Sequence, residues 1–224
     1  MVPPLSRRRF LAAVAALPVL AAAPAAAALF PGAGFWTFVA LDAGGTPCGA
    51  LSYRFARRPG LFTVSVESFY RLPAPGGRQV VRHSAEERWR DGWLYGLDSR
   101  TRIGERRHRL RSARDELALR GTRDGLAFSV SGYVVPSSLW HPETPRLEAL
   151  LDSVTGRSRV IRGRRGPRQS VALWPAGAGR VEATRWRVGG ELRRELWYDA
   201  GGRLVRARFP APDGSPVVLQ RQAG

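Results

Sequence analysis

The stretch that decides the fold is LFTVSVESFY, residues 61–70, in which apolar and polar side chains alternate. Phe62, Val64, Val66 and Tyr70 fall on one side of an extended chain, because successive side chains of a β-strand point to opposite faces. The alternation predicts a strand with one buried face. Shorter runs with the same alternation recur along the chain and predict an antiparallel sheet.

Tight-turn signals separate these runs and predict hairpins. They stand at residues 91–92, 123–125, 189–190, 199–202 and 212–214. Their spacing predicts about a dozen strands, as in all-β sandwiches and barrels. Because so many strands must hide their edges, we expect a mainly all-β fold, either a single strongly curved antiparallel sheet or an open β-barrel.

One segment departs from this alternation. PETPRLEALL, residues 142–151, has a proline at its start and leucines at positions 147, 150 and 151. Proline is favoured in the first turn of a helix, and this leucine spacing places the side chains on one helical face. The segment predicts one short helix or helical turn that caps an end of the sheet.

The N-terminus has the features of an export signal. SRRRFL, residues 6–11, resembles the twin-arginine motif, and an alanine-rich apolar run follows it up to Ala28. We predict a twin-arginine-type signal peptide at residues 1–28, a single β-rich domain at residues 29–224, and a periplasmic or otherwise exported protein. A retained membrane anchor over residues 10–30 is the alternative, although Pro18 and Pro24 interrupt that helix.

The chain is strongly basic. Its formal net charge is +18, and subtracting the three arginines of the signal leaves +15 for residues 29–224. Such a charge indicates an anionic partner, such as a membrane surface. A GC-rich genome is an alternative explanation for the absence of lysine, but it does not explain the excess of arginine over acid. We expect no nucleic-acid partner, because no stacked-aromatic RNA motif is present.

The cysteine, histidine and glycine patterns argue against a disulfide, a metal site and a nucleotide site. Cys48 is the only cysteine, so no intramolecular disulfide can form. His83, His108 and His141 are widely separated and do not match a common ligand spacing. No phosphate-binding glycine loop is present. We therefore predict no metal site, no cofactor and no catalytic residue.

Several motifs together resemble a known family. They are ERWRDGWL at 87–94, SSLW at 137–140, LLDSVTG at 150–156 and LWYD at 196–199, followed by GRL at 202–204. In this order they resemble a family of exported bacterial β-rich proteins of unknown function, over roughly Phe35 to Leu219. The family looks similar to curved-sheet carriers of the lipoprotein-localisation type. The resemblance implies a β-rich fold and an envelope role, and it supplies no catalytic residue.

The aromatic hairpin around Asp91 is the candidate ligand site. Aromatic rings at the mouth of a curved sheet can bind an apolar ligand, while nearby arginines hold an anionic headgroup. The alternative is cross-strand aromatic packing around the turn. The predicted ligand-binding residues are Trp89, Arg90, Trp93, Tyr95 and Trp140.

Three functions remain open from the sequence. The first is binding of a lipid or other apolar or amphipathic ligand in the curved sheet. The second is docking on an anionic membrane or a partner, for which RSRVIRGRRGPR at 157–168 is either a contact or a solvated strand that discourages aggregation. The third is a hydrolase centred on Ser138, His141 and a distant Asp, which requires Ser138 Oγ to lie within hydrogen-bond distance of His141 or another base.

Overall fold

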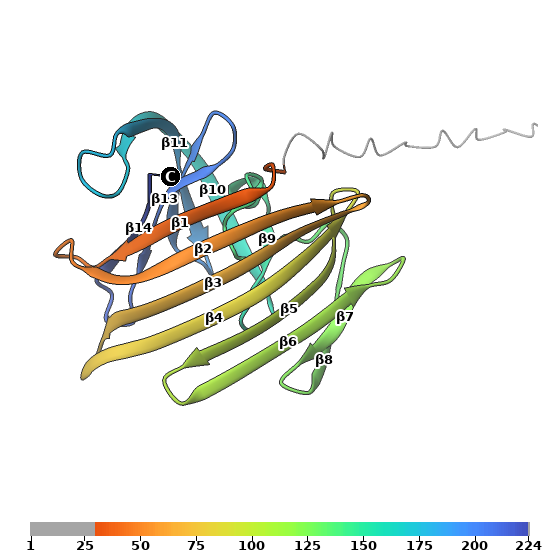
Figure 1. Cartoon of the computed structure of the whole chain (residues 1–224). Helices are drawn as coiled ribbons and strands as arrows, with labels where there is room; N and C mark the ends of the chain where they lie inside the picture. The colour runs from red at the N-terminus through yellow and green to blue at the C-terminus, as the bar shows by residue number, and fades with distance from the viewer. Residues whose placement is uncertain (1–29, 224) are drawn as a thin grey trace, which may run out of the picture.

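The computed structural model describes residues 30–223 (Figure 1). Within them a single sheet of fourteen antiparallel strands follows the order β8-β7-β6-β5-β4-β3-β2-β1-β14-β13-β12-β11-β10-β9. The mainly all-β prediction is confirmed, and the sheet is open because no pairing joins β8 to β9 in the described residues. The predicted signal peptide, residues 1–28, lies outside them. The strands are β1 Gly34–Leu41, β2 Pro47–Arg58, β3 Leu61–Ala74, β4 Gly77–Arg90, β5 Trp93–Ile103, β6 Arg106–Arg114, β7 Ala118–Arg123, β8 Leu126–Ser131, β9 Ala149–Leu151, β10 Ser158–Ala172, β11 Arg180–Gly190, β12 Arg194–Asp199, β13 Leu204–Pro210 and β14 Pro216–Arg221.

The predicted strand at 61–70 lies within β3, which continues to Ala74. Phe62, Val64 and Val66 are buried and define the inner face of the sheet, and the intervening side chains define its outer face. Two predicted turns are tight hairpins with both residues at positive φ: Asp91-Gly92 at 48° and 81°, and Asp124-Gly125 at 51° and 84°. Such turns match the twist of the flanking strands.

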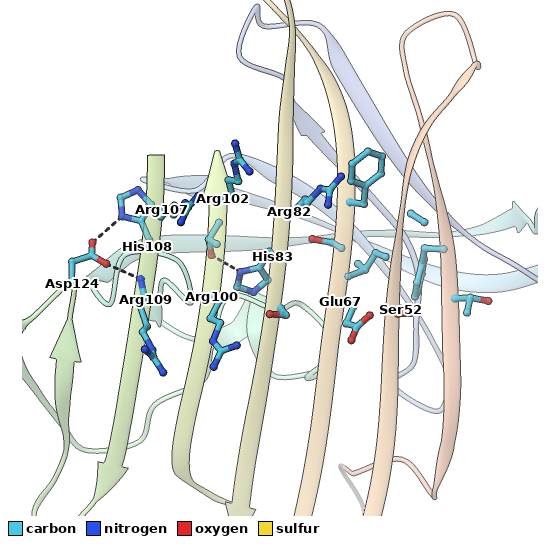
Figure 2. A pocket seen from close by; sticks show the side chains of 18 of the residues that line it. Ser52, Glu67, Arg82, His83, Arg100, Arg102, Arg107, His108, Arg109 and Asp124 are labelled. Atoms are coloured by element: carbon cyan, nitrogen blue, oxygen red, sulfur yellow. Dashed lines mark hydrogen bonds and ion pairs between the residues drawn. The ribbon is translucent and has the colours of Figure 1, made fainter. Parts of the chain in front are cut away.

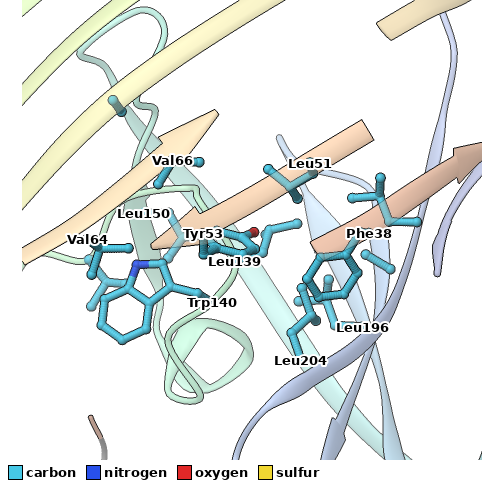
Figure 3. Close-up of a cluster of buried hydrophobic side chains, with 14 of the residues drawn as sticks. Phe38, Leu51, Tyr53, Val64, Val66, Leu139, Trp140, Leu150, Leu196 and Leu204 are labelled. Atoms are coloured by element: carbon cyan, nitrogen blue, oxygen red, sulfur yellow. The ribbon is translucent and has the colours of Figure 1, made fainter. Parts of the chain in front are cut away.

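The interior is filled by the chain between β8 and β10, residues 132–157, here called the inserted segment. Its side chains Leu139, Trp140 and Leu150 are buried against the inner face (Figure 3). Leu151 is buried as well. The backbone is held from both sides: Leu151 N–H donates to Val135 O at 2.9 Å, and β9 pairs with β10. The inserted segment therefore completes the core that the open sheet cannot close by itself.

The short helix or helical turn predicted within 142–151 is present as a single turn. Only Thr144–Arg146 forms a turn of 3-10 helix, and residues 149–151 form β9. Leu150 and Leu151 are instead buried because β9 lies between β10 and the chain at Val135 and Pro136, whereas Leu147 precedes β9 and is partly buried. Tertiary pairing outweighs a short helical pattern, since helices of a few residues have little stability of their own.

The inserted segment also fits closely against β10. A Cβ atom at Gly163 would lie 1.7 Å from the Pro145 carbonyl oxygen, so only glycine permits this approach. Two tyrosines of the sheet hold the segment by their hydroxyls: Tyr53 donates to Ser138 O, and Tyr198 donates to Leu139 O at 2.7 Å. The buried segment thus has partners for backbone carbonyls that would otherwise be costly to bury.

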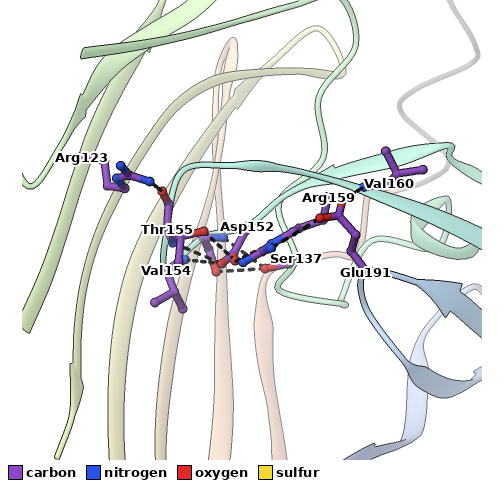
Figure 4. Close-up of polar contacts among 9 residues, drawn as sticks. Arg123, Ser137, Asp152, Val154, Thr155, Arg159, Val160 and Glu191 are labelled. Atoms are coloured by element: carbon purple, nitrogen blue, oxygen red, sulfur yellow. Dashed lines mark hydrogen bonds and ion pairs between the residues drawn. The ribbon is translucent and has the colours of Figure 1, made fainter. Parts of the chain in front are cut away.

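Asp152 anchors the end of the inserted segment (Figure 4). Its carboxylate accepts hydrogen bonds from Val154 N and Thr155 Oγ1 at 2.9 and 2.7 Å and from the guanidinium of Arg159 on β10 at 3.1 Å. Burial raises the pKa of Asp152, but these hydrogen bonds outweigh it and lower the pKa overall. Arg123 of β7 donates to Thr155 O at 3.0 Å, so both halves of the sheet contact this turn.

Candidate functional site

The five residues predicted to bind a ligand do not form one open site. Trp89 and Trp140 lie in the interior, 1% and 0% exposed, with ring centroids 5.6 Å apart. Trp93 is 41% exposed and its ring lies 5.5 Å from Tyr133. Arg90 is exposed, and its guanidinium lies 4.0 Å from the ring centroid of Tyr95. The structure therefore separates the two buried indoles from three residues at the surface.

A buried carboxylate joins the two indoles. Glu87, 0% exposed, accepts hydrogen bonds at Oε2 from Trp89 Nε1 at 3.1 Å and from Trp140 Nε1 at 2.8 Å. Its other oxygen, Oε1, has no hydrogen-bond partner in the described part of the chain. Burial raises the pKa of Glu87 to about 7, although the neighbouring Ser138 hydroxyl and the two indole N–H groups lower it. Glu87 thus ties β4 to the inserted segment, a role the sequence did not reveal.

Ser138 and His141 do not form the pair that the hydrolase hypothesis requires. His141 Nε2 lies 3.4 Å from Tyr133 Oη, and its Nδ1 accepts from Glu143 N–H at 3.3 Å. Ser138 Oγ is buried beside the Glu87 carboxylate, whose pKa it helps to lower, and it makes no hydrogen bond of regular geometry among residues 30–223. Burial lowers the pKa of His141 to about 4, so the ring is neutral near neutral pH. His141 is therefore not placed to act as the base for Ser138.

A pocket of about 1120 Å³ lies on the outer face, across β1 to β6 (Figure 2). We call it the arginine groove. Strand registers place its side chains in two rows that run perpendicular to the strands, one on each side of the groove. The residues between the rows direct their side chains to the inner face, so their backbone forms the floor of the groove. One row is Phe69, Arg82, Arg102 and Arg107, and the other is Thr37, Ser52, Glu67, Ser84, Arg100 and Arg109.

The groove carries more positive than negative charge. Its five arginines are all exposed, whereas its acidic residues are Glu67 and Asp124. Asp124 is already engaged, because it accepts from Arg109 N–H at 2.7 Å and pairs with His108 Nδ1 at 2.9 Å. Arg102 pairs with Glu105 at 3.1 Å. For the other four arginines, the described residues place no acidic oxygen within ion-pairing distance.

His83 lies behind the groove and contributes no charge to it. Its Nδ1 hydrogen-bonds Thr101 Oγ1 at 2.7 Å, and burial lowers the pKa of His83 to about 4. The groove's positive potential therefore comes from guanidinium groups, which stay charged at every physiological pH.

Apolar side chains share the outer face with these arginines. Phe69 has the guanidiniums of Arg82 and Arg71 at 5.2 and 5.5 Å from its ring centroid. Phe35 is 65% exposed and Val80 is 38% exposed. Exposed aromatic rings beside arginines are typical of surfaces that contact the interfacial region of a bilayer.

The described residues offer little support for other kinds of site. They contain no group of three or more His, Cys, Asp or Glu side chains placed to hold a metal ion. No helix within residues 30–223 is long and apolar enough to cross a membrane. Cys48, the lone cysteine, is buried, and burial raises the pKa of its thiol.

The sequence reasoning missed the arginine groove. Its signal was present in residues 100–111, TRIGERRHRLR preceded by Arg100, where arginines alternate with other residues on both arms of a hairpin. Alternation places such arginines on one face of two adjacent strands. The run at 157–168 was considered instead, although residues 100–111 hold six arginines in the same length of chain.

The fold and the groove define an open, β-barrel-like sheet protein with a basic outer face. The sequence matches the domain of unknown function DUF6134 over residues 40–222, so the chain belongs to that family. This confirms the resemblance to an uncharacterised β-rich family. No curated protein matches the sequence.

One solved structure is similar in fold. It is the crystal structure of a beta-barrel-like protein of the domain of unknown function DUF1849 from Brucella abortus. The TM-score is 0.59 at 9% sequence identity, and the match covers 84% of this chain and 94% of that chain. At this identity the likeness concerns the fold alone.

Proposed function

We propose that this protein is an exported envelope protein that docks on an anionic lipid surface through the arginine groove. The observation that carries the proposal is the set of four groove arginines with no ion-pair partner, Arg82, Arg100, Arg107 and Arg109. Guanidinium groups recognise phosphate oxygens by paired hydrogen bonds, which suits phospholipid headgroups. The twin-arginine-like N-terminus would bring the protein to such a surface.

The neighbouring apolar side chains favour a membrane over a purely ionic partner. Phe35, Phe69 and Val80 lie on the same face as the groove. Inserting such side chains at the headgroup level removes apolar area from water, while the arginines contact phosphates. The carrier function inferred from the sequence has less support at Trp89 and Trp140, because the inserted segment occupies the inner face beside them.

Charge reversal in the groove tests this proposal. The variant Arg82→Glu/Arg100→Glu/Arg109→Glu should lose vesicle affinity by about 100-fold or more, since each basic residue near an anionic surface contributes about 1 kcal/mol. Co-sedimentation with vesicles of phosphatidylglycerol and phosphatidylcholine measures this affinity. We expect wild-type binding to weaken as salt is raised, because exposed charges are screened.

The matched control reverses three exposed arginines of β10, Arg162, Arg164 and Arg168, and changes the net charge equally. We expect this control to keep most of the affinity. Equal losses in the two triple variants would mean that only net charge matters and would overturn the assignment to the groove. Loss in the β10 variant alone would move the contact to the run at 157–168.

A further inference from the structure

Phe30 covers a cluster of aromatic rings at one end of the interior. Its ring centroid lies 4.9 Å from that of Phe62, 5.5 Å from Trp89, and 5.7 Å from both Trp140 and His141. Phe30 precedes β1, which begins at Gly34, so it belongs to no strand of the sheet. A side chain outside the sheet therefore fills a position in the aromatic core.

A second pocket, of about 510 Å³, opens beside Phe30. It lies between the β2–β3 and β4–β5 hairpins and is bounded by Phe30, Phe62 and Trp89. Its volume is within the range typical of small-molecule sites, which are mostly apolar with a few polar groups. We call the position of the Phe30 ring together with this pocket the aromatic slot.

The mouth of the aromatic slot is basic. Arg57 and Arg58 line it, with Asp91 as its acidic side chain, and both arginines are exposed. Neither arginine forms an ion pair with the residues that the structure describes. The guanidinium of Arg57 lies 5.5 Å from the ring centroid of Phe62, so positive charge stands directly at the edge of the apolar surface.

We infer that the aromatic slot is a binding site for a single-chain amphipathic anion, and that Phe30 occupies it in competition with that ligand. The ligand's apolar chain would take the place of the Phe30 ring against Phe62 and Trp89. Its anionic end, a carboxylate or a phosphate, would lie at Arg57 and Arg58. Gly32 precedes β1 and Gly34 is its first residue. The conformational freedom of these glycines allows Phe30 to move out of the slot.

Removing the competing side chain tests this inference. A ligand that must displace Phe30 binds with an affinity reduced by the fraction of molecules whose slot is vacant. The variant Phe30→Ala should therefore bind dodecyl phosphate about tenfold more tightly than the wild type in isothermal titration calorimetry. Phe35→Ala is the matched control, since Phe35 is an exposed phenylalanine nearby in the chain and should leave the affinity unchanged.

Two further arms identify the chemistry of the ligand. Dodecanoate compared with dodecyl phosphate distinguishes a fatty acid from a phosphate headgroup. Dodecyltrimethylammonium, with the same chain and opposite charge, should bind more weakly than either anion. Arg57→Glu/Arg58→Glu should weaken binding of the anions at least fivefold. The triple variant of the arginine groove should bind the anions as tightly as the wild type does. This difference separates the aromatic slot from the proposed docking function.

The inference is overturned by any of three results. One is equal affinity in Phe30→Ala and Phe35→Ala. Another is equal binding of the cationic and anionic chains, which would indicate nonspecific apolar contact. The third is the absence of binding to both the wild type and Phe30→Ala under conditions in which both proteins are folded.

Discussion

Replacing Trp140 with alanine is expected to lower the free energy of unfolding by about 3 to 5 kcal/mol, the range found for large aromatic side chains deleted from protein cores. Trp140 is 0% exposed, and its ring contacts Phe55 and Phe62 of the sheet at centroid distances of 5.7 and 5.8 Å. Its indole also donates to Glu87, so the substitution removes one of two donors to a buried carboxylate.

Urea unfolding at constant pH measures this loss. Trp93→Ala is the matched control, because Trp93 is 41% exposed and its removal should cost less than about 1 kcal/mol. If Trp140→Ala does not fold, Trp140→Phe retains an aromatic ring but removes the N–H donor and part of the indole volume, with an expected cost of about 1 to 3 kcal/mol. Equal stability of the alanine variants at 140 and 93 would contradict the packing of the inserted segment.

The second large effect is a pH dependence that Glu87 imposes on folding. Its pKa is about 7 in the folded protein and 4.5 for an unperturbed glutamate, so the folded state holds the proton more tightly than the unfolded state does. Stability from this group is therefore present at acidic pH and is lost as pH rises from about 4.5 to about 7. Over this interval the loss amounts to roughly 3 kcal/mol.

Glu87→Gln removes this dependence, because the amide keeps an oxygen for the two indoles and never ionises. Relative to the wild type, this variant should gain roughly 2 to 3 kcal/mol in unfolding free energy between about pH 5 and pH 8. Glu86→Gln is the control, since its side chain is 53% exposed on the outer face, and it should show no such gain.

The buried histidines act in the opposite direction. Burial lowers the pKa of His83 and of His141 to about 4, so their contribution to stability grows as pH rises from about 4 to 6.5. Both histidines are present in every protein compared, and the difference between Glu87→Gln and wild type isolates Glu87. A difference that does not change with pH would mean that Glu87 is not buried as described.

Local patterns carried most of the information about the sheet. The alternation of Phe62, Val64 and Val66 and the turns at Asp91-Gly92 and Asp124-Gly125 depend on neighbouring residues only, and the structure contains each of them. These signals arise within one or two strands, so a single sequence displays them. Whether the sheet closes could not be predicted from the sequence, and the open end between β8 and β9 depends on the pairing of the whole sheet.

The inserted segment was not predictable in the same way. Its burial depends on contacts distant in sequence, such as Tyr53 with Ser138 and Tyr198 with Leu139. Residues 142–151 therefore carried a helical spacing that β9 pairing overrides. Glu87 was likewise hidden, because a glutamate in a strand ordinarily faces solvent and only the indoles of Trp89 and Trp140 reveal its partners.

The candidate site also combines features that a local sequence pattern shows with features that depend on the folded sheet. Trp89 and Trp140 were predicted to bind a ligand, and the structure buries both of them in the interior. The arginine groove required strand registers that bring Arg82, Arg100 and Arg109 onto adjacent strands. A sequence shows which residues alternate, but the register across the two hairpins that join β4, β5 and β6 is fixed by the folded sheet.

The central claim is that the outer face of β1 to β6 contacts an anionic membrane, and a fluorescent label in the groove tests it most directly. Ser84 is exposed and lies in the arginine groove, and Ser158 is exposed at the start of β10. Cys48 is buried, so a cysteine introduced at either position can be labelled selectively with an environment-sensitive dye.

With vesicles of phosphatidylglycerol, we expect the dye at Ser84→Cys to shift to shorter emission wavelength, and to be quenched by a quencher carried on the lipid headgroup. The dye at Ser158→Cys should change little, and pure phosphatidylcholine should affect neither. An unchanged spectrum at Ser84→Cys in a protein that co-sediments with the vesicles would contradict the account, because the membrane would then contact another face.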